Sequence, residues 1–202
     1  MMQDRRRKCT PGIKDEEFCR GQVPMTKEEI RVLLLSKACL EVDNTIYDVG
    51  AGTGSIAVEA ALLARRGKIF AVEKEPEGIN LIRRNAARFG VTNLEVVAGE
   101  APDVLEPLPP ADRIFLGGSG GNLNSILETC DRKLRAGGII VISAVTLNTL
   151  LSAYQFLDSR GYRRQIVMVN VARLERLGGT EAFRGLNPVY IISGVKEEKG
   201  ER

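Results

Sequence analysis

One short stretch, IYDVGAGTGSIAVEA at residues 46–60, constrains the fold more than any other part of the chain. It joins an apolar, strand-like run to an alanine-rich, helix-like segment through Gly50, Gly52 and Gly54. Glycine adopts backbone conformations that side chains disfavour, and it lets a ligand approach the backbone closely. The N–H groups at the start of a helix add free hydrogen-bond donors. The stretch therefore predicts a strand–turn–helix unit whose turn holds a ligand.

The spacing of these glycines indicates the kind of ligand. The dinucleotide fingerprint is G-x-G-x-x-G and opens its helix toward a pyrophosphate, whereas the spacing here is G-x-G-x-G. With Asp48 just before it, the turn suits a ligand without phosphates, and we expect Asp48 to order that ligand. Glu73 ends the next strand-like run, where an acid accepts hydrogen bonds from ribose hydroxyls. The alternatives are a solvated surface acid for Glu73 and a simple turn residue for Asp48.

Strand-like and helix-like segments alternate along most of the chain. Strands are expected at residues 45–49, 68–73, 93–99, 112–118 and 139–144, and helices at 26–40, 55–66, 76–89, 122–135 and 147–160. Thr26 and Glu29 have the spacing of a capping box at the first helix. The alternation predicts a parallel sheet covered on both faces. After Gly161 two strands, 162–175 and 187–194, lack a helix between them, so we expect antiparallel neighbours.

Composition narrows the class of protein. No run of about 18 uncharged apolar residues is present, and no apolar segment follows the basic N-terminus, so we expect neither a membrane span nor a secretory signal. The net charge of +3 permits an anionic substrate but does not require nucleic acid. We expect a single domain at residues 11–195, with a basic tail at 1–10 and a charged tail at 196–202.

The cysteine and histidine content excludes several chemistries. The chain has no histidine, and its four cysteines form no C-x-x-C pair; they are Cys9, Cys19, Cys39 and Cys130. A zinc site built from protein ligands and a histidine general base are therefore not expected. Widely spaced cysteines indicate free thiols in a reducing compartment, and hence a cytoplasmic protein.

Four features together resemble the class I S-adenosylmethionine-dependent methyltransferases. They are DVGAGTG at residues 48–54, the acid of FAVEKE at 70–75, GEAP at 99–102 and the seven-strand pattern. The resemblance covers about residues 45–195. It implies an α/β, Rossmann-like fold with a seven-stranded, mostly parallel sheet, an antiparallel last strand and helices on both faces. It also implies S-adenosyl-L-methionine as the cofactor.

Two further stretches narrow the resemblance. GIKDEEFCRGQVPMTKEEIR at residues 12–31 precedes the first strand, and IFLGGSGGNLNSIL at 114–127 follows the fourth. With them, nearly the whole domain resembles the decarboxylating cobalt-precorrin (precorrin) C15-methyltransferases of cobalamin biosynthesis. The resemblance implies methyl transfer to C15 of cobalt-precorrin-6B, with loss of the C12 acetate carboxylate as carbon dioxide. It also implies a tetrapyrrole substrate, a homo-oligomer such as a tetramer, and neither nucleic-acid nor membrane partners.

The same resemblance assigns cofactor-binding residues. These are Thr26, Gly50, Ala51, Gly52, Thr53, Gly54, Glu73 and Ala101. The resemblance implies that the glycine turn contacts the methionine and ribose side of the cofactor, that Glu73 binds the ribose and that Ala101 lies beside the adenine. The alternative role of Thr26 is to cap a helix. No catalytic residue is assigned, because loss of carbon dioxide leaves electrons that the macrocycle holds, and the enzyme then needs orientation more than a base. No metal bound by the protein is expected.

A tetrapyrrole with many carboxylates needs cationic partners, and arginine suits bidentate carboxylate contacts. Loops and helix ends offer Lys27, Arg31, Arg173, Arg176 and Arg184. An ordinary surface charge is the alternative for each of them. The glycine loop at residues 116–121 is the expected acceptor side, where exposed backbone N–H groups suit a carboxylate. Residues 172–185 are expected to form a substrate lid or a subunit contact, and NPVY at 187–190 is interpreted as structural.

Other functions stay open at this point. A class I methyltransferase acting on RNA or protein fits the same motifs, although an Asn/Asp-Pro-Pro-Tyr motif is missing after the fourth strand and the charge is weak for RNA. A non-catalytic S-adenosylmethionine- or nucleotide-binding module is a third hypothesis, against which the intact GAGTG turn and Glu73 argue. A NAD-dependent dehydrogenase is a fourth, disfavoured by the glycine spacing.

Overall fold

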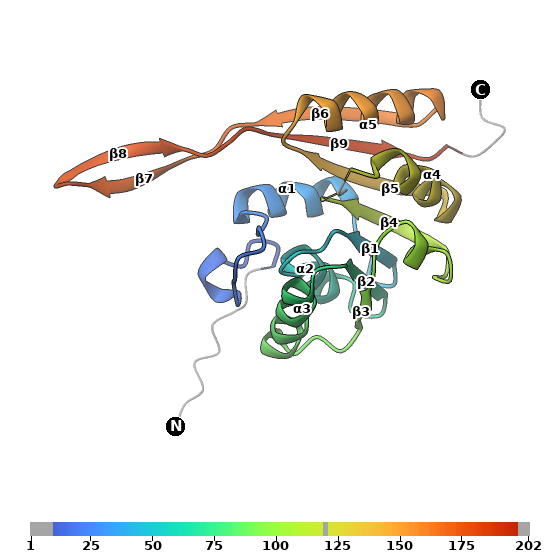
Figure 1. The fold of residues 1–202 in the computed structure, drawn as a ribbon, viewed down its shortest axis with the longest axis horizontal. Coiled ribbons are helices and arrows are strands. Elements are labelled where there is room, and N and C mark those ends of the chain that lie inside the picture. Colours follow the sequence, from blue (N-terminus) through green and yellow to red (C-terminus); the bar gives the residue numbers. More distant parts are fainter. Residues whose placement is uncertain (1–9, 119–120, 198–202) are drawn as a thin grey trace.

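The sheet at the centre of the structure has seven strands in the order β3-β2-β1-β4-β5-β9-β6 (Figure 1). The computed structural model describes residues 10–118 and 121–197. The strands of this sheet are β1 (Thr45–Val49), β2 (Lys68–Glu73), β3 (Leu94–Ala98), β4 (Ala111–Leu116), β5 (Leu134–Ala144), β6 (Arg163–Val169) and β9 (Val189–Val195). Neighbouring strands from β3 to β5 run parallel, whereas β9 runs antiparallel to both β5 and β6. This arrangement confirms the expected fold class.

Helices cover both faces of this sheet. They are η1 (Asp15–Glu17), α1 (Glu28–Ala38), α2 (Ser55–Leu63), α3 (Pro76–Phe89), η2 (Asp103–Leu105), α4 (Leu123–Lys133) and α5 (Leu147–Ser159). Side chains of α1, α2 and α3 pack with Ile46, Ile69 and Val141 on one face, and those of α4 and α5 pack with Tyr47 and Ile142 on the other. Because both faces are covered, the central strands are apolar at successive positions instead of alternating.

Three expected helix ends are wrong by two or three residues. The structure ends α1 at Ala38, α2 at Leu63 and α4 at Lys133. Because β5 begins directly after α4, it includes the glycines that are expected from the sequence to end that helix. Gly137 N–H donates to the carbonyl of Lys196 at 2.8 Å, and Lys196 N–H donates to that of Gly138 at 2.9 Å. These bonds with the antiparallel partner hold both glycines beside the sheet, which a helix-ending pattern in the sequence does not anticipate.

The strand expected at residues 162–175 is divided in two. β6 ends at Val169, and β7 (Ala172–Leu177) pairs with β8 (Thr180–Gly185) in a separate two-stranded sheet. Gly178 and Gly179 connect these strands with φ angles of 54° and 93°, and two successive positive φ angles form the tight turn that fits the twist of a hairpin. Figure 1 shows this β7–β8 hairpin extending away from the seven-stranded sheet. Its role as a lid or subunit contact stays a prediction.

The start of α1 differs from the predicted capping box. The N-cap residue is Lys27, and its side chain makes no capping hydrogen bond. Asp15 supplies the acceptor instead, because its Oδ1 accepts the N–H of Glu28 at 3.0 Å. The Glu29 carboxylate binds an arginine of β7. A carboxylate from a preceding segment therefore caps this helix, and the Thr26–Glu29 box is wrong.

Within residues 10–118 and 121–197, no helix is long and apolar enough to cross a membrane. The two predicted tails fall almost entirely on residues 1–9 and 198–202, which lie outside the described residues, as does Cys9. The expected domain bounds at residues 11 and 195 therefore stay predictions.

Candidate active site

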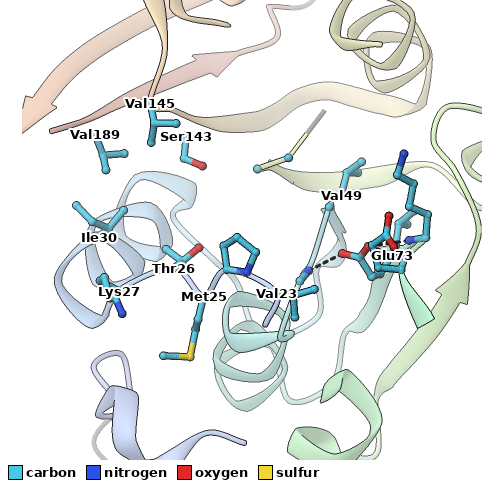
Figure 2. A pocket seen from close by; sticks show the side chains of 18 of the residues that line it. Val23, Met25, Thr26, Lys27, Ile30, Val49, Glu73, Ser143, Val145 and Val189 are labelled. Atoms are coloured by element: carbon cyan, nitrogen blue, oxygen red, sulfur yellow. Dashed lines mark hydrogen bonds between the residues drawn. The ribbon is translucent and has the colours of Figure 1, made fainter. Parts of the chain in front are cut away.

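A cavity of about 650 Å³ lies at the carboxyl ends of the parallel strands (Figure 2). Its lining includes Val49 at the end of β1, Val72 of β2, Gly117 just after β4 and Ser143 near the end of β5. Residues 23–27, directly before α1, form another part of its wall. In an open α/β sheet, ligands bind in the crevice beyond the carboxyl ends of the strands, so this cavity is the candidate active site.

The glycine turn forms part of this wall and has no room for side chains. Gly50 and Gly52 have φ angles of 73° and 56°, which favour glycine. A Cβ on Gly50 would lie 2.5 Å from the carbonyl oxygen of Gly118, and one on Gly52 would lie 2.9 Å from that of Pro24. Gly50 N–H also donates to the carbonyl of Val72 at 3.0 Å. The turn is therefore fixed on β2 and presents backbone to the cavity.

Glu73, at the end of β2, is directed at this turn. Its Oε2 accepts the N–H of Gly52 at 2.7 Å, and its Oε1 accepts those of Lys74 and Glu75 at 2.8 and 2.9 Å. Figure 2 marks hydrogen bonds of this carboxylate at the cavity wall. An ionised carboxylate has about four acceptor positions, so three N–H donors leave capacity for a further hydroxyl. This geometry is compatible with the predicted ribose contact.

Asp48 lies beneath the turn and is not among the residues that line the cavity. Its Oδ2 accepts the N–H of Ala57 in α2 at 3.0 Å. Burial of the carboxyl raises the pKa of Asp48 to about 7; the Ala57 hydrogen bond opposes that rise, and the charge of Glu73 adds to it. Asp48 therefore orders the first turn of α2, and its expected role in ordering the ligand stays a prediction.

The structure brings five of the eight predicted cofactor residues to the cavity, namely Thr26, Gly50, Gly52, Glu73 and Ala101. The lining residues do not include Ala51, Thr53 or Gly54. The Thr53 hydroxyl is buried and has no hydrogen-bond partner among the described residues. Gly54 is the N-cap of α2, and a Cβ there would lie 3.0 Å from Ile82. Contact of these residues with a cofactor stays a prediction.

The cavity is also lined by residues that the sequence motifs do not mark. Ser143 and Val145 come from the end of β5, while Val171 and Leu186 flank the β7–β8 hairpin. Asn187 and Val189 of NPVY also line the cavity, and the structural interpretation of this motif stays a prediction. These residues could have been found from their position in the sequence. Residues that follow the fifth apolar strand reach the same edge of the sheet as the glycine turn.

Two predicted carboxylate-binding arginines are already paired within the protein. Arg31 is fully buried and forms ion pairs with Glu59 and Asp15 at 2.5 and 3.4 Å. Arg173, near the base of the hairpin, binds Glu29 and Asp15 at 2.6 and 3.1 Å. Neither arginine lines the cavity. Internal carboxylates compensate both charges, so neither is a free partner for a substrate.

The other candidates differ in position. Lys27 lines the cavity, whereas Arg176 and Arg184 lie on the β7–β8 hairpin. Of the expected acceptor loop, residues 117–118 line the cavity, and residues 119–120 lie outside the described residues. Lys27 and the start of the glycine loop are therefore the predicted substrate contacts that reach the cavity.

The charged residues of the cavity gather around Glu73. Glu75, Glu100 and Lys74 line the same part, and the Lys74 ammonium lies 2.9 Å from the Glu100 carboxylate. Apart from these four residues, the described lining contains no acid and one cation, Lys27. The described part of the chain also holds no cluster of three His, Cys, Asp or Glu side chains that suits a metal ion. The cavity thus has a polar, acidic end and a largely apolar end.

The sheet order with antiparallel β9, together with a glycine turn bonded to a buried acid on the next strand, defines a class I methyltransferase, and solved methyltransferases share this fold. Residues 17–196 match the family model described as the precorrin methyltransferase domain. The chain belongs to the precorrin methyltransferase family.

Individual relatives agree with this family over nearly their whole length. A Pyrobaculum aerophilum protein named "probable cobalt-precorrin-6B C(15)-methyltransferase (decarboxylating)" is 46% identical, over 91% of this chain and 95% of that protein. The Salmonella typhimurium cobalt-precorrin-6B C(15)-methyltransferase (decarboxylating) is 38% identical, over 94% and 99% of the two chains. The crystal structure of a precorrin-6y C5,15-methyltransferase from Geobacter metallireducens has a TM-score of 0.87 and 42% identity, over 92% and 96%. These likenesses confirm the resemblance seen in the motifs, and this chain is a methyltransferase.

Proposed function

We propose that this protein methylates C15 of cobalt-precorrin-6B and removes the C12 acetate carboxylate as carbon dioxide, as a step of cobalamin biosynthesis. The observation that carries the proposal is similarity to proteins with that name over more than nine-tenths of the chain. The cavity supports the proposal, because a large conjugated ring suits its apolar end better than a charged polymer does.

The proposed cofactor is S-adenosylmethionine, which supplies an electrophilic methyl group when it is bound. A turn closed to side chains and a buried carboxylate at its edge fit this ligand. We assign the methionine and ribose side to Gly50 and Gly52, the ribose hydroxyls to Glu73 and the edge of the adenine to Ala101. Thr26 borders the same space from the segment before α1.

The remaining proposed cofactor residues act through the shape of the turn. Gly54 and Thr53 connect it to α2, and Ala51 N–H donates to the carbonyl of Val72 at 3.0 Å.

The substrate carries several carboxylates, and the chain offers few cationic side chains to bind them. Lys27 at the cavity is the proposed partner for one carboxylate, and Arg176 and Arg184 of the hairpin are proposed for peripheral ones. The residues of the apolar end exclude water from the face of the ring. Loss of carbon dioxide supplies the electron pair for the new bond, so the chain is not required to provide a strong base.

We also propose that the protein works in the cytoplasm as a homo-oligomer, without nucleic-acid or membrane partners. The β7–β8 hairpin is the proposed subunit contact. Its residues Leu174 and Phe183 are 55% and 75% exposed, and projecting apolar side chains of this kind mark interaction surfaces. Light scattering of the full chain, compared with a Phe183→Ser variant, tests this contact.

The experiment that tests the function is a turnover assay with the purified chain, methyl-labelled S-adenosylmethionine and cobalt-precorrin-6B. We expect the tetrapyrrole to gain the labelled methyl and to lose carbon dioxide in equal amounts, measured by mass spectrometry and gas analysis. Cofactor binding without any change in the tetrapyrrole would contradict the proposed acceptor, and RNA and protein acceptors would then be tested with the same label.

A further inference from the structure

Ser143 is a polar residue in an apolar row of β5. The preceding residues on the same face, Ile139 and Val141, are buried in the core beneath α1 and α2, and Ile191 of β9 lies directly opposite Ser143. The Ser143 hydroxyl makes no hydrogen bond with another described residue, and Figure 2 shows it directed into the cavity. Because polar groups among apolar neighbours are normally hydrogen-bonded, this hydroxyl suits a polar group of a ligand.

Ser143 lies where the two ends of the cavity meet. A Cβ on Gly117 would lie 3.5 Å from the Gly50 carbonyl oxygen and 3.9 Å from the Ser143 hydroxyl. The glycine turn is therefore on one side of Ser143, and the apolar residues Ile126 and Val145 line the other part of the cavity. A substrate group bound at Ser143 would lie next to the place proposed for methyl transfer.

The charges around Ser143 suit a carboxylate that leaves as carbon dioxide. The acids of the cavity gather around Glu73, which Figure 2 places on the opposite side from Ser143. The ammonium of Lys27 is directed away from Ser143 in the same view. A nearby cation would stabilise the carboxylate before reaction more than the charge-dispersed transition state, and so would slow the loss of carbon dioxide. A neutral hydroxyl among apolar side chains orients the carboxylate and stabilises its charge less than a cation does.

We propose that Ser143 donates a hydrogen bond to the C12 acetate carboxylate and so orients the bond that breaks; this inference rests on the proposed function. The bond between the acetate methylene and the carboxylate carbon breaks, and carbon dioxide leaves. The electron pair of that bond makes a double bond from the acetate methylene into the conjugated ring, which forms the new bond from C15 to the methyl group. A proton then moves from C15 to the methylene carbon, which becomes the C12 methyl. The negative charge of the carboxylate and the positive charge of the methyl donor disappear together, so no oxidant, reductant or external base takes part.

The test compares Ser143→Ala with Ser193→Ala. Ser193 lies on the same face of the neighbouring strand, opposite Val141, and does not line the cavity. Binding of cobalt-precorrin-6B is followed by its visible absorption with S-adenosylhomocysteine present, and the affinity for S-adenosylhomocysteine alone is measured by calorimetry. For Ser143→Ala we expect about tenfold weaker tetrapyrrole binding, at least about tenfold slower carbon dioxide release, and cofactor-product affinity within about twofold of wild type.

Two further measurements separate orientation from a merely structural role. In Ser143→Ala, carbon–carbon cleavage becomes more rate-limiting, so the ¹³C isotope effect on the released carbon dioxide rises. Ser143→Thr keeps a hydroxyl on a β-branched side chain that suits a strand, and it restores most of the rate. Ser193→Ala behaves as wild type in every measurement.

Distinct results overturn the inference. Wild-type rate and isotope effect in Ser143→Ala would exclude a role for the hydroxyl. Equal loss of S-adenosylhomocysteine affinity, without rescue by Ser143→Thr, would mean that Ser143 only supports the fold. If the wild-type chain itself neither methylates nor decarboxylates cobalt-precorrin-6B, the proposed function fails, and this inference fails with it.

Discussion

The guanidinium of Arg31 lies 2.5 Å from the carboxylate of Glu59, and neither side chain is exposed to solvent. Arg31 also donates to the carbonyls of Ile13 and Thr26, while Glu59 accepts the N–H groups of Gly12 and Ile13. One buried ion pair thus ties the N-terminal segment to α1 and α2. Because that segment leads into residues that line the cavity, the pair supports the site without entering it.

Replacing Arg31 by Met should cost about 3–5 kcal/mol of unfolding free energy, because it leaves the Glu59 carboxylate buried without its cation. Urea unfolding of the purified variant measures this loss. The matched control is Arg184→Met: Arg184 pairs with Glu175 on the hairpin with 68% of its side chain exposed, and its removal should cost less than about 1 kcal/mol. Equal losses for the two variants would show that burial does not govern this ion pair.

Glu73→Gln should weaken binding of S-adenosylhomocysteine. Hydrogen bonds to a charged acceptor contribute about 1.5–3 kcal/mol, which corresponds to roughly 10- to 100-fold in affinity. Calorimetric titration measures the change, and circular dichroism checks the fold. Glu95→Gln is the control, because Glu95 forms an exposed pair with Lys68 on neighbouring strands and does not line the cavity. Unchanged affinity in Glu73→Gln would remove Glu73 from the proposed cofactor site.

Gly50→Ala and Gly90→Ala form a pair that separates backbone strain from steric contact. Their φ angles are 73° and 66°, so each alanine should cost about 1–2 kcal/mol of stability through its left-handed conformation. A Cβ on Gly90 meets nothing within 4 Å, whereas one on Gly50 lies 2.5 Å from the Gly118 carbonyl oxygen. We therefore expect Gly50→Ala alone to lose S-adenosylhomocysteine affinity as well. Retained affinity in that variant would contradict the close packing of turn and loop.

The site could be predicted from the sequence where its chemistry is local. Gly50, Gly52 and Glu73 are found from a strand–turn–helix pattern and the end of the next strand, and the structure joins them by a 2.7 Å hydrogen bond from Gly52 N–H to Glu73. The seven-stranded sheet follows from the same kind of pattern. For the glycine turn and for the sheet, residues close in sequence determine the geometry, so hydrophobic periodicity and turn chemistry are sufficient to predict them.

The remainder depends on contacts between distant segments. Arg31 is separated from Glu59 by 28 residues, and no periodicity marks their pairing, so the sequence leaves Arg31 as a candidate for the substrate or for an ordinary surface charge. The end of α4 is likewise determined by bonds to Lys196. The β7–β8 hairpin was different, because Gly178 and Gly179 between strand-like runs are a known hairpin signal. The hairpin is therefore predictable from turn chemistry, although a lid or subunit contact is the only expectation stated for residues 172–185.

The pH dependence of stability should report Asp48. Its folded pKa of about 7 exceeds its ordinary value of 3.8, so between those values the folded carboxyl is protonated while the unfolded one is ionised. The unfolded state then binds fewer protons, and stability falls as the pH rises from about 4 to about 7, by an amount on the order of 4 kcal/mol, and is level above that range.

Asp48→Asn removes this titration and keeps an oxygen acceptor for the Ala57 N–H. Urea unfolding at several pH values between about 4.5 and 8 should therefore show the variant gaining stability relative to wild type as the pH rises. Asp43→Asn, at an exposed position before β1, should follow the wild-type curve. If the Asp48→Asn and wild-type curves stay parallel, the carboxyl ionises in the folded protein as readily as in the unfolded chain, and burial does not control its charge.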